Sequence, residues 1–128
     1  LHLSIRRQRQ MCIRDRSNQV RLMLNNALLA FEKLHANEAF EVMRDDGSVD
    51  FEYQSAVRAL MTYVMADARQ VTQVMNLMWV LRALERIGDH ARNIAELVIY
   101  ISSGTDVRHS DFHTVKQAVD ASKDKGLS

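Results

Sequence analysis

One segment of the chain carries oxygen-bearing side chains at intervals of three or four residues, which places them along one face of a helix. These residues are Glu85, Asp89, Asn93 and Glu96. The apolar residues of the same segment fall on another side of the helix, and this pattern predicts burial: Leu84, Ile87, Ala91, Ile94 and Val98. Because carboxylates are hard ligands, a helix with these two faces can pack into a bundle and hold hard cations.

A second acidic pair, Asp46 and Asp50, has the same i, i+4 spacing if that region is one helix. Two such pairs on neighbouring antiparallel helices can surround a cation. The sequence between them weakens this prediction, because Gly47 costs about 1 kcal/mol in a helix interior and Ser48 can cap a new helix. The candidate metal ligands are Asp46, Asp50, Glu85 and Asp89.

The alternative interpretation of these carboxylates is a solvated acidic face. Arg82, Arg86 and Arg92 lie on the same helix and can form helical ion pairs with them, each contributing only tenths of a kcal/mol. Residue types and spacing leave the metal site and the solvated face open.

The first sixteen residues differ in character from the rest. Residues 6–16 resemble the in-frame translation of a transposase-based sequencing adapter, with residues 11–15 back-translating to ATG TGT ATA AGA GAC. We therefore exclude residues 1–16 from fold reasoning as an adapter-derived artefact that is expected to be unstructured or non-native; the alternative is a basic N-terminal arm. They hold five arginines and one aspartate, so the other 112 residues carry a net charge of −3, whereas the whole chain carries +1.

Three long amphipathic segments predict an all-α fold. Apolar stripes of helical period run over residues 20–34, 49–64 and about 71–102. Breaks are expected at 35–37, where Asn37 is placed as a helix cap, and at 66–70, and Gly104 is the expected stop. We predict an elongated antiparallel three-helix bundle over residues 17–103, whose third helix spans roughly 45 Å. Residues 104–128 form a polar C-terminal tail, loosely held, with a short helix around residues 112–119.

Several function classes lack support in the sequence. After residue 16 no run of lysine or arginine remains, so a nucleic-acid-binding surface is not expected. Apolar runs end well before the roughly twenty residues of a membrane span, and the only cysteine is Cys12, which fits a cytoplasmic protein. A phosphate-binding loop, a nucleophile elbow and an HExxH pair are all missing. We predict no enzyme, no catalytic residue and no organic cofactor.

Residues 85–96, ERIGDHARNIAE, resemble the E-R-I-G-D-[HR]-x-x-N-I-x-E signature of the PhoU family, accessory regulators of bacterial phosphate uptake. The resemblance extends over nearly all of residues 18–109. Residues 30–39 are similar to the family's first helix and restart, residues 45–53 to its D-x-x-V-D-x-x-[EY] segment, and residues 104–109 to its G-x-D-x-R-H run.

This resemblance implies a function by protein contact. A PhoU-like protein would couple the ATPase of the phosphate ABC transporter to the phosphate sensor histidine kinase, touch the membrane only indirectly and repress the phosphate-starvation response. Complete family members hold two three-helix repeats, so the chain is expected to be a C-terminal repeat, truncated at its N-terminus, of a protein that forms a homodimer when full length. The family's [ED]-x-x-x-D motifs, which in some members bind metal clusters, fall on Asp46, Asp50, Glu85 and Asp89, and imply iron, zinc or manganese. The alternative function is a metal-binding helical bundle that acts in storage or buffering.

Overall fold

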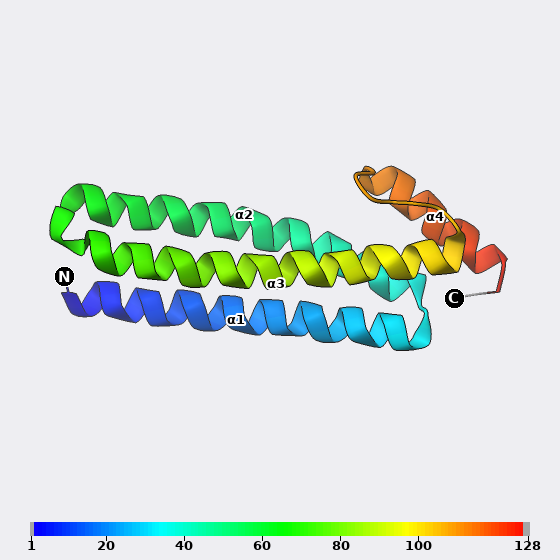
Figure 1. Cartoon of the computed structure of the whole chain (residues 1–128), viewed down its shortest axis with the longest axis horizontal. Coiled ribbons are helices and arrows are strands. Elements are labelled where there is room, and N and C mark those ends of the chain that lie inside the picture. Colours follow the sequence, from blue (N-terminus) through cyan, green and yellow to red (C-terminus); the bar gives the residue numbers. More distant parts are fainter. Residues whose placement is uncertain (1, 127–128) are drawn as a thin grey trace.

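Three long helices lie side by side and form an elongated rod (Figure 1): α1 (His2–Lys33), α2 (Ala36–Ala66) and α3 (Val71–Ser103). This computed structural model describes the backbone of residues 2–126 and the side chains of residues 13–126. A shorter helix, α4 (Phe112–Asp124), packs at the end of the rod where α1 passes into α2. Residues 2–126 contain no strand, so the predicted all-α antiparallel bundle is confirmed.

Two of the predicted helix ends lie where the local chemistry placed them. Gly104 has a φ of 76°, and its N–H donates to the carbonyl oxygen of Tyr100 at 2.8 Å. This left-handed conformation is a frequent helix terminator because glycine has no Cβ to clash. Between α2 and α3 the chain forms a single 3₁₀ turn, η1 (Ala68–Gln70), which Asp67 caps by accepting a hydrogen bond from the N–H of Arg69 at 3.1 Å.

Helix α2 corrects two expectations. It begins at Ala36, with His35 as the N-cap and no side-chain capping bond, so the prediction of Asn37 as the cap is wrong. It also continues without a break through Gly47 and Ser48. The packing of the helix outweighs the cost of about 1 kcal/mol for one glycine, because apolar side chains on both sides of Gly47 are buried in the core.

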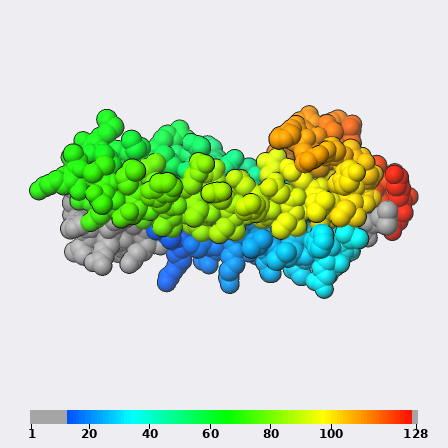
Figure 2. Space-filling model, viewed as in Figure 1, coloured from blue at the N-terminus to red at the C-terminus, as the bar shows by residue number. Residues whose placement is uncertain are grey.

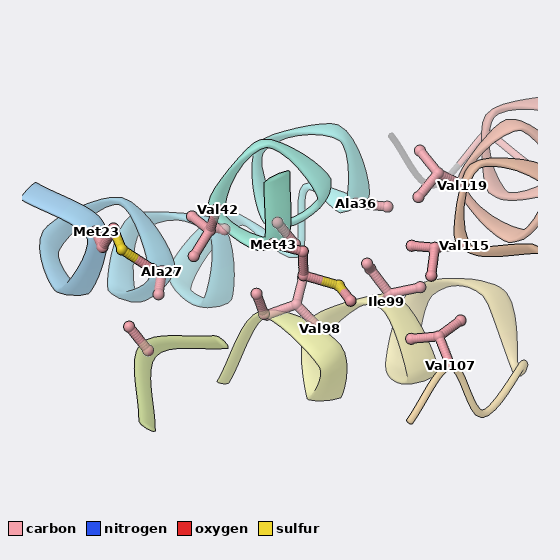
Figure 3. Packing of buried hydrophobic residues seen from close by; sticks show 14 of the residues in the cluster. Met23, Ala27, Ala36, Val42, Met43, Val98, Ile99, Val107, Val115 and Val119 are labelled. Carbon is pink, nitrogen blue, oxygen red and sulfur yellow. The ribbon is translucent and has the colours of Figure 1, made fainter. Parts of the chain in front are cut away.

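The main hydrophobic core lies in the half of the rod that includes α4. Alanines from all three long helices are fully buried there, with exposed fractions of 0–1%: Ala27, Ala30, Ala36, Ala39, Ala91 and Ala95. Small side chains let helices approach closely, and larger ones fill the space between them. Figure 3 shows Met23, Val42, Met43, Val98 and Ile99 meeting in this cluster. A smaller cluster of Ala56, Leu60, Val74 and Leu81 joins α2 and α3 near η1.

Helix α4 belongs to the main core. Val115, Ala118 and Val119 are buried, and Figure 3 places Val115 and Val119 beside Val107 and Ile99. Asp111 caps the helix by accepting a hydrogen bond from the N–H of Thr114 at 3.1 Å. The expectation of a loosely held tail with a short helix over residues 112–119 therefore differs from the structure, in which the helix is longer and packed.

The buried face of α3 is rotated slightly from the predicted stripe. Ala91 and Val98 are buried as expected, but Ile87 is 40% exposed and Ala95 and Ile99 are buried instead. The reason is that α3 contacts both α1 and α2, so its core-facing side points between two helices. Figure 2 shows the outer side of α3, coloured green to yellow, along the surface of the rod.

The first helix includes part of the segment that the sequence set apart. Its backbone is helical from His2, whereas residues 1–16 were expected to be unstructured or non-native, and the side chains of residues 1–12 lie outside the described part. Arg16 is buried, with Nη1 donating to the carbonyl oxygen of Val49 at 3.3 Å and Nη2 lying 3.8 Å from Glu52 Oε2. The adapter origin of the segment stays a prediction.

None of the helices in the described part of the chain combines the length and the apolar character required to cross a bilayer.

Candidate functional site

Asp46 is the most deeply buried of the four predicted metal ligands. Its side chain is only 5% exposed and faces α3 from the continuous helix α2. Arg92 of α3 donates from Nη1 to Asp46 Oδ2 at 3.0 Å, and its Nε donates to Glu96 Oε1 at 3.1 Å. One guanidinium therefore joins a carboxylate of its own helix to a carboxylate of the neighbouring helix. We call Asp46, Arg92 and Glu96 the interhelix triad.

Gly88 lies directly opposite the buried carboxylate. A Cβ built on Gly88 would lie 3.9 Å from Asp46 Oδ1, an ordinary van der Waals distance. Glycine leaves free space around Asp46, but a methyl group would also fit.

Electrostatic neighbours of Asp46 include the other predicted site residues. Burial raises the pKa of the Asp46 carboxyl above its usual value of 3.8, Arg92 opposes the shift by hydrogen bond and charge, and Asp50 and Asp89 add to it. The pKa of Asp46 is raised even with a guanidinium against it, because the burial penalty exceeds the effect of the ion pair. Arg92 thus offsets part of the cost of ionising the buried Asp46 carboxyl.

Glu85 lies in the same negative field. Partial burial raises the pKa of its carboxyl, and the charges of Asp89, Asp50 and Asp46 raise it further, while Arg82 lowers it. The four predicted ligands therefore do lie on neighbouring turns of α2 and α3, close enough to affect one another. Among the residues with described side chains, however, no three histidine, cysteine, aspartate or glutamate side chains are placed to hold one metal ion.

Burial separates the four residues. Asp46 is buried, Glu85 is half-buried, and Asp50 and Asp89 are exposed. A shared metal ion would need oxygens from both helices directed at one point, whereas the most enclosed oxygen, Asp46 Oδ2, is directed at Arg92. Sequence reasoning treated Arg92 as one of three interchangeable helical arginines. The i, i+4 spacing of Arg92 and Glu96 was visible, but the bond across to α2 depends on tertiary packing.

A shallow depression lies beside the triad, on the outer side of α3. Arg108 there forms a bidentate ion pair with Asp106, with separations of 2.6 Å (Nη2–Oδ2) and 3.0 Å (Nε–Oδ1), and this contact lowers the pKa of Asp106 to about 2. The depression is lined by Asn93, Glu96, Leu97, Tyr100, Asp106 and Arg108. Its charged groups are already paired, Arg108 with Asp106 inside the depression and Glu96 with Arg92 beside it.

Comparison with known proteins identifies the family. Residues 13–98 match the family described as the PhoU domain. The chain belongs to the PhoU family. A PhoU homologue of Pseudomonas aeruginosa, named a phosphate-specific transport system accessory protein, is 50% identical over 108 residues, covering 84% of this chain and 45% of that protein. The Pseudomonas putida homologue of the same name is 52% identical over 97 residues, covering 76% of this chain and 38% of that protein.

The PhoU fold is also found in a solved structure. The crystal structure of PhoU from Pseudomonas aeruginosa superposes with a TM-score of 0.70 at 52% identity, covering 72% of this chain and 44% of that chain. The chain thus spans less than half the length of these relatives. The family resemblance read from residues 84–96 and from the ordered segments around them is confirmed.

Proposed function

We propose that this chain is part of a negative regulator of phosphate uptake and phosphate-starvation signalling. It would act by contact with the ATPase of a phosphate ABC transporter and with a phosphate sensor histidine kinase, on the cytoplasmic side of the membrane and as a homodimer when full length. The observation that carries the proposal is the 50% identity over 108 residues to a protein named as an accessory protein of phosphate-specific transport.

The architecture supports a role by contact. An elongated rod offers long helix faces, and several large apolar side chains remain open on it, including Phe51, Met65 and Trp79 at 70%, 86% and 69% exposure. Exposed apolar groups of this size are typical of surfaces that meet another protein or another part of the same protein. The relatives are named accessory proteins rather than enzymes.

The other function class, metal storage or buffering, receives less support from the geometry. Its central ligand, Asp46, is already bonded to Arg92. We therefore do not propose it as the function of the chain.

Complementation tests the regulatory proposal. The full-length gene that contains this segment should silence a phosphate-starvation reporter in a bacterial host that lacks its own copy. The 128-residue chain alone should fail or act weakly, since it spans less than half of its relatives.

A binding assay on the same proteins provides the second readout. Immobilised full-length protein should retain the transporter ATPase and the cytoplasmic part of the kinase from purified stocks. A matched control is a full-length protein with Leu81→Asp, which places a charge in the buried α2–α3 cluster and should abolish folding and binding together. Full-length, folded protein with no effect on the reporter and no binding to either partner would refute the proposal.

A further inference from the structure

The α2–α3 interface concentrates negative charge around one positive group. Asp46, Asp50, Glu85 and Asp89 influence one another electrostatically, and Glu96 lies on the next turns of α3. Like charges this close oppose helix packing unless a cation offsets them. The described structure places Arg92 in contact with this group through two carboxylates, one from each helix.

The residues do not fit the metal ion that members of the PhoU family can bind. A divalent ion held between the two helices would take Asp46 as its ligand from α2, because Asp46 is the α2 carboxylate that is enclosed there. Its Oδ2 accepts a hydrogen bond from Arg92 Nη1 at 3.0 Å instead. In the described part of the chain no set of three acidic or histidine side chains is arranged around a common point.

We propose that Arg92 is the internal counter-cation of this interface, so that the chain holds its α2–α3 carboxylates together without a divalent metal ion. The guanidinium suits this role better than an ammonium group, because its planar fork can donate in two directions while remaining charged. Nη1 reaches across to α2 and Nε stays on α3. Arg92 thereby bridges the two helices as a metal ion would.

The burial of the three side chains supports the bridge. Asp46 is 5% exposed and Glu96 11% exposed, while Arg92 is 35% exposed. Two carboxylates are therefore withdrawn from water and share one cation whose side chain stays partly exposed to solvent. Removing the charge of Arg92 leaves both buried carboxylates without their partner, which is far more costly than losing a surface ion pair.

The experiment compares matched charge changes on one helix. Arg92→Gln and Arg86→Gln each remove one arginine charge from α3, and Arg86 is exposed with no ion pair among the described side chains. Thermal unfolding of the 128-residue chain at pH 7 should show a loss of about 10 °C for Arg92→Gln and about 2 °C or less for Arg86→Gln. Arg92→Lys keeps the charge and should fall between wild type and Arg92→Gln.

A second arm separates charge balance from simple loss of packing. Adding Asp46→Asn to Arg92→Gln neutralises both partners and should restore part of the lost melting temperature, even if the single variant is barely folded. Chelator-stripped wild type titrated with manganese and with zinc chloride should take up no ion at micromolar concentration and keep its melting temperature. Equal losses for Arg92→Gln and Arg86→Gln, or a wild type that binds either ion and melts several degrees higher, would overturn the proposal. Loss of reporter silencing tests the regulatory role separately, because this experiment measures only stability and ion uptake.

Discussion

Ser102 Oγ donates a hydrogen bond to the carbonyl oxygen of Leu34 at a distance of 3.1 Å. The contact connects the last turn of α3 to the two-residue link, Leu34 and His35, between α1 and α2. Leu34 has a φ of 53°, a left-handed conformation that is rare for a bulky residue. The N–H of His35 donates to the carbonyl oxygen of Ala30 at 3.0 Å, as in the helix-ending motif that usually holds glycine at this position.

Leu34→Gly should therefore stabilise the chain, by about 1 kcal/mol, because glycine adopts the left-handed conformation without strain. The side chain of Leu34 is 41% exposed, so its removal costs little packing. Leu34→Ala is the matched control, since alanine loses the same contacts but keeps the strain. Chemical denaturation in urea measures the free energy of unfolding of both variants. A glycine variant no more stable than the alanine variant would contradict the prediction.

Gly88→Ala should also leave the chain equally or more stable. The added Cβ meets Asp46 Oδ1 at an ordinary 3.9 Å, while alanine improves helix propensity by roughly 0.5–1 kcal/mol. Gly88→Ile, which adds branched bulk at the same buried position, should cost about 1–3 kcal/mol. Urea denaturation distinguishes the two outcomes. A large loss in the alanine variant would show that α2 and α3 approach more closely than described.

The stability of the chain should depend on pH through the ionisation of Asp46. Its pKa in the folded chain is raised above 3.8 by burial, so the folded state binds a proton more readily than the unfolded state. Stability from this group is fully present below about pH 4 and is lost as the pH rises through the raised pKa. The melting temperature of wild type relative to Asp46→Asn should therefore increase as the pH falls from 7 towards 4. A difference that is constant over this range, or that shrinks, would contradict the prediction.

Neutralising the outer carboxylates should relieve repulsion. Burial and the charges of Asp89, Asp50 and Asp46 raise the pKa of Glu85, so its negative charge is unfavourable at pH 7. Glu85→Gln combined with Asp89→Asn should raise the free energy of unfolding slightly, by about 0.3–0.5 kcal/mol, and alter no metal uptake. Glu32→Gln on α1 is the control for an exposed glutamate. Calorimetry that detects an ion bound by wild type and lost in the double variant would instead support the metal site predicted from sequence.

Removal of α4 should destabilise the main core. A chain ending at Ser110 lacks Val115 and Val119 and uncovers Val107 and Ile99, which should cost roughly 3–5 kcal/mol. The single substitution Val115→Ala should cost about 2 kcal/mol, whereas Lys116→Ala, at the neighbouring exposed position, should cost less than about 0.5 kcal/mol. Thermal unfolding of the three variants shows the order of their stability losses. If the shortened chain melts like wild type, α4 does not belong to the core.

The sequence by itself determined the features that depend on local chemistry. Hydrophobic periodicity predicted three long helices, and Gly104 ended the third because a left-handed residue stops a helix regardless of the rest of the fold. The ordered motifs identified the PhoU family. The acidic residues at helical spacing did come to lie on neighbouring turns, because spacing along a helix is also local.

Only the tertiary structure decided the features that depend on which helices meet. Gly47 stays helical because packing on both sides outweighs its propensity, and α4 is held because its apolar face covers Val107 and Ile99. The partner of Asp46 was decided in the same way. The spacing of Asp46 and Asp50 equally suited a metal ion or a solvated face, and the relative rotation of α2 and α3 brought Arg92 to 3.0 Å from Asp46. That rotation follows from how α3 buries its alanines against two helices at once, a property of the assembled core that no single segment of sequence contains.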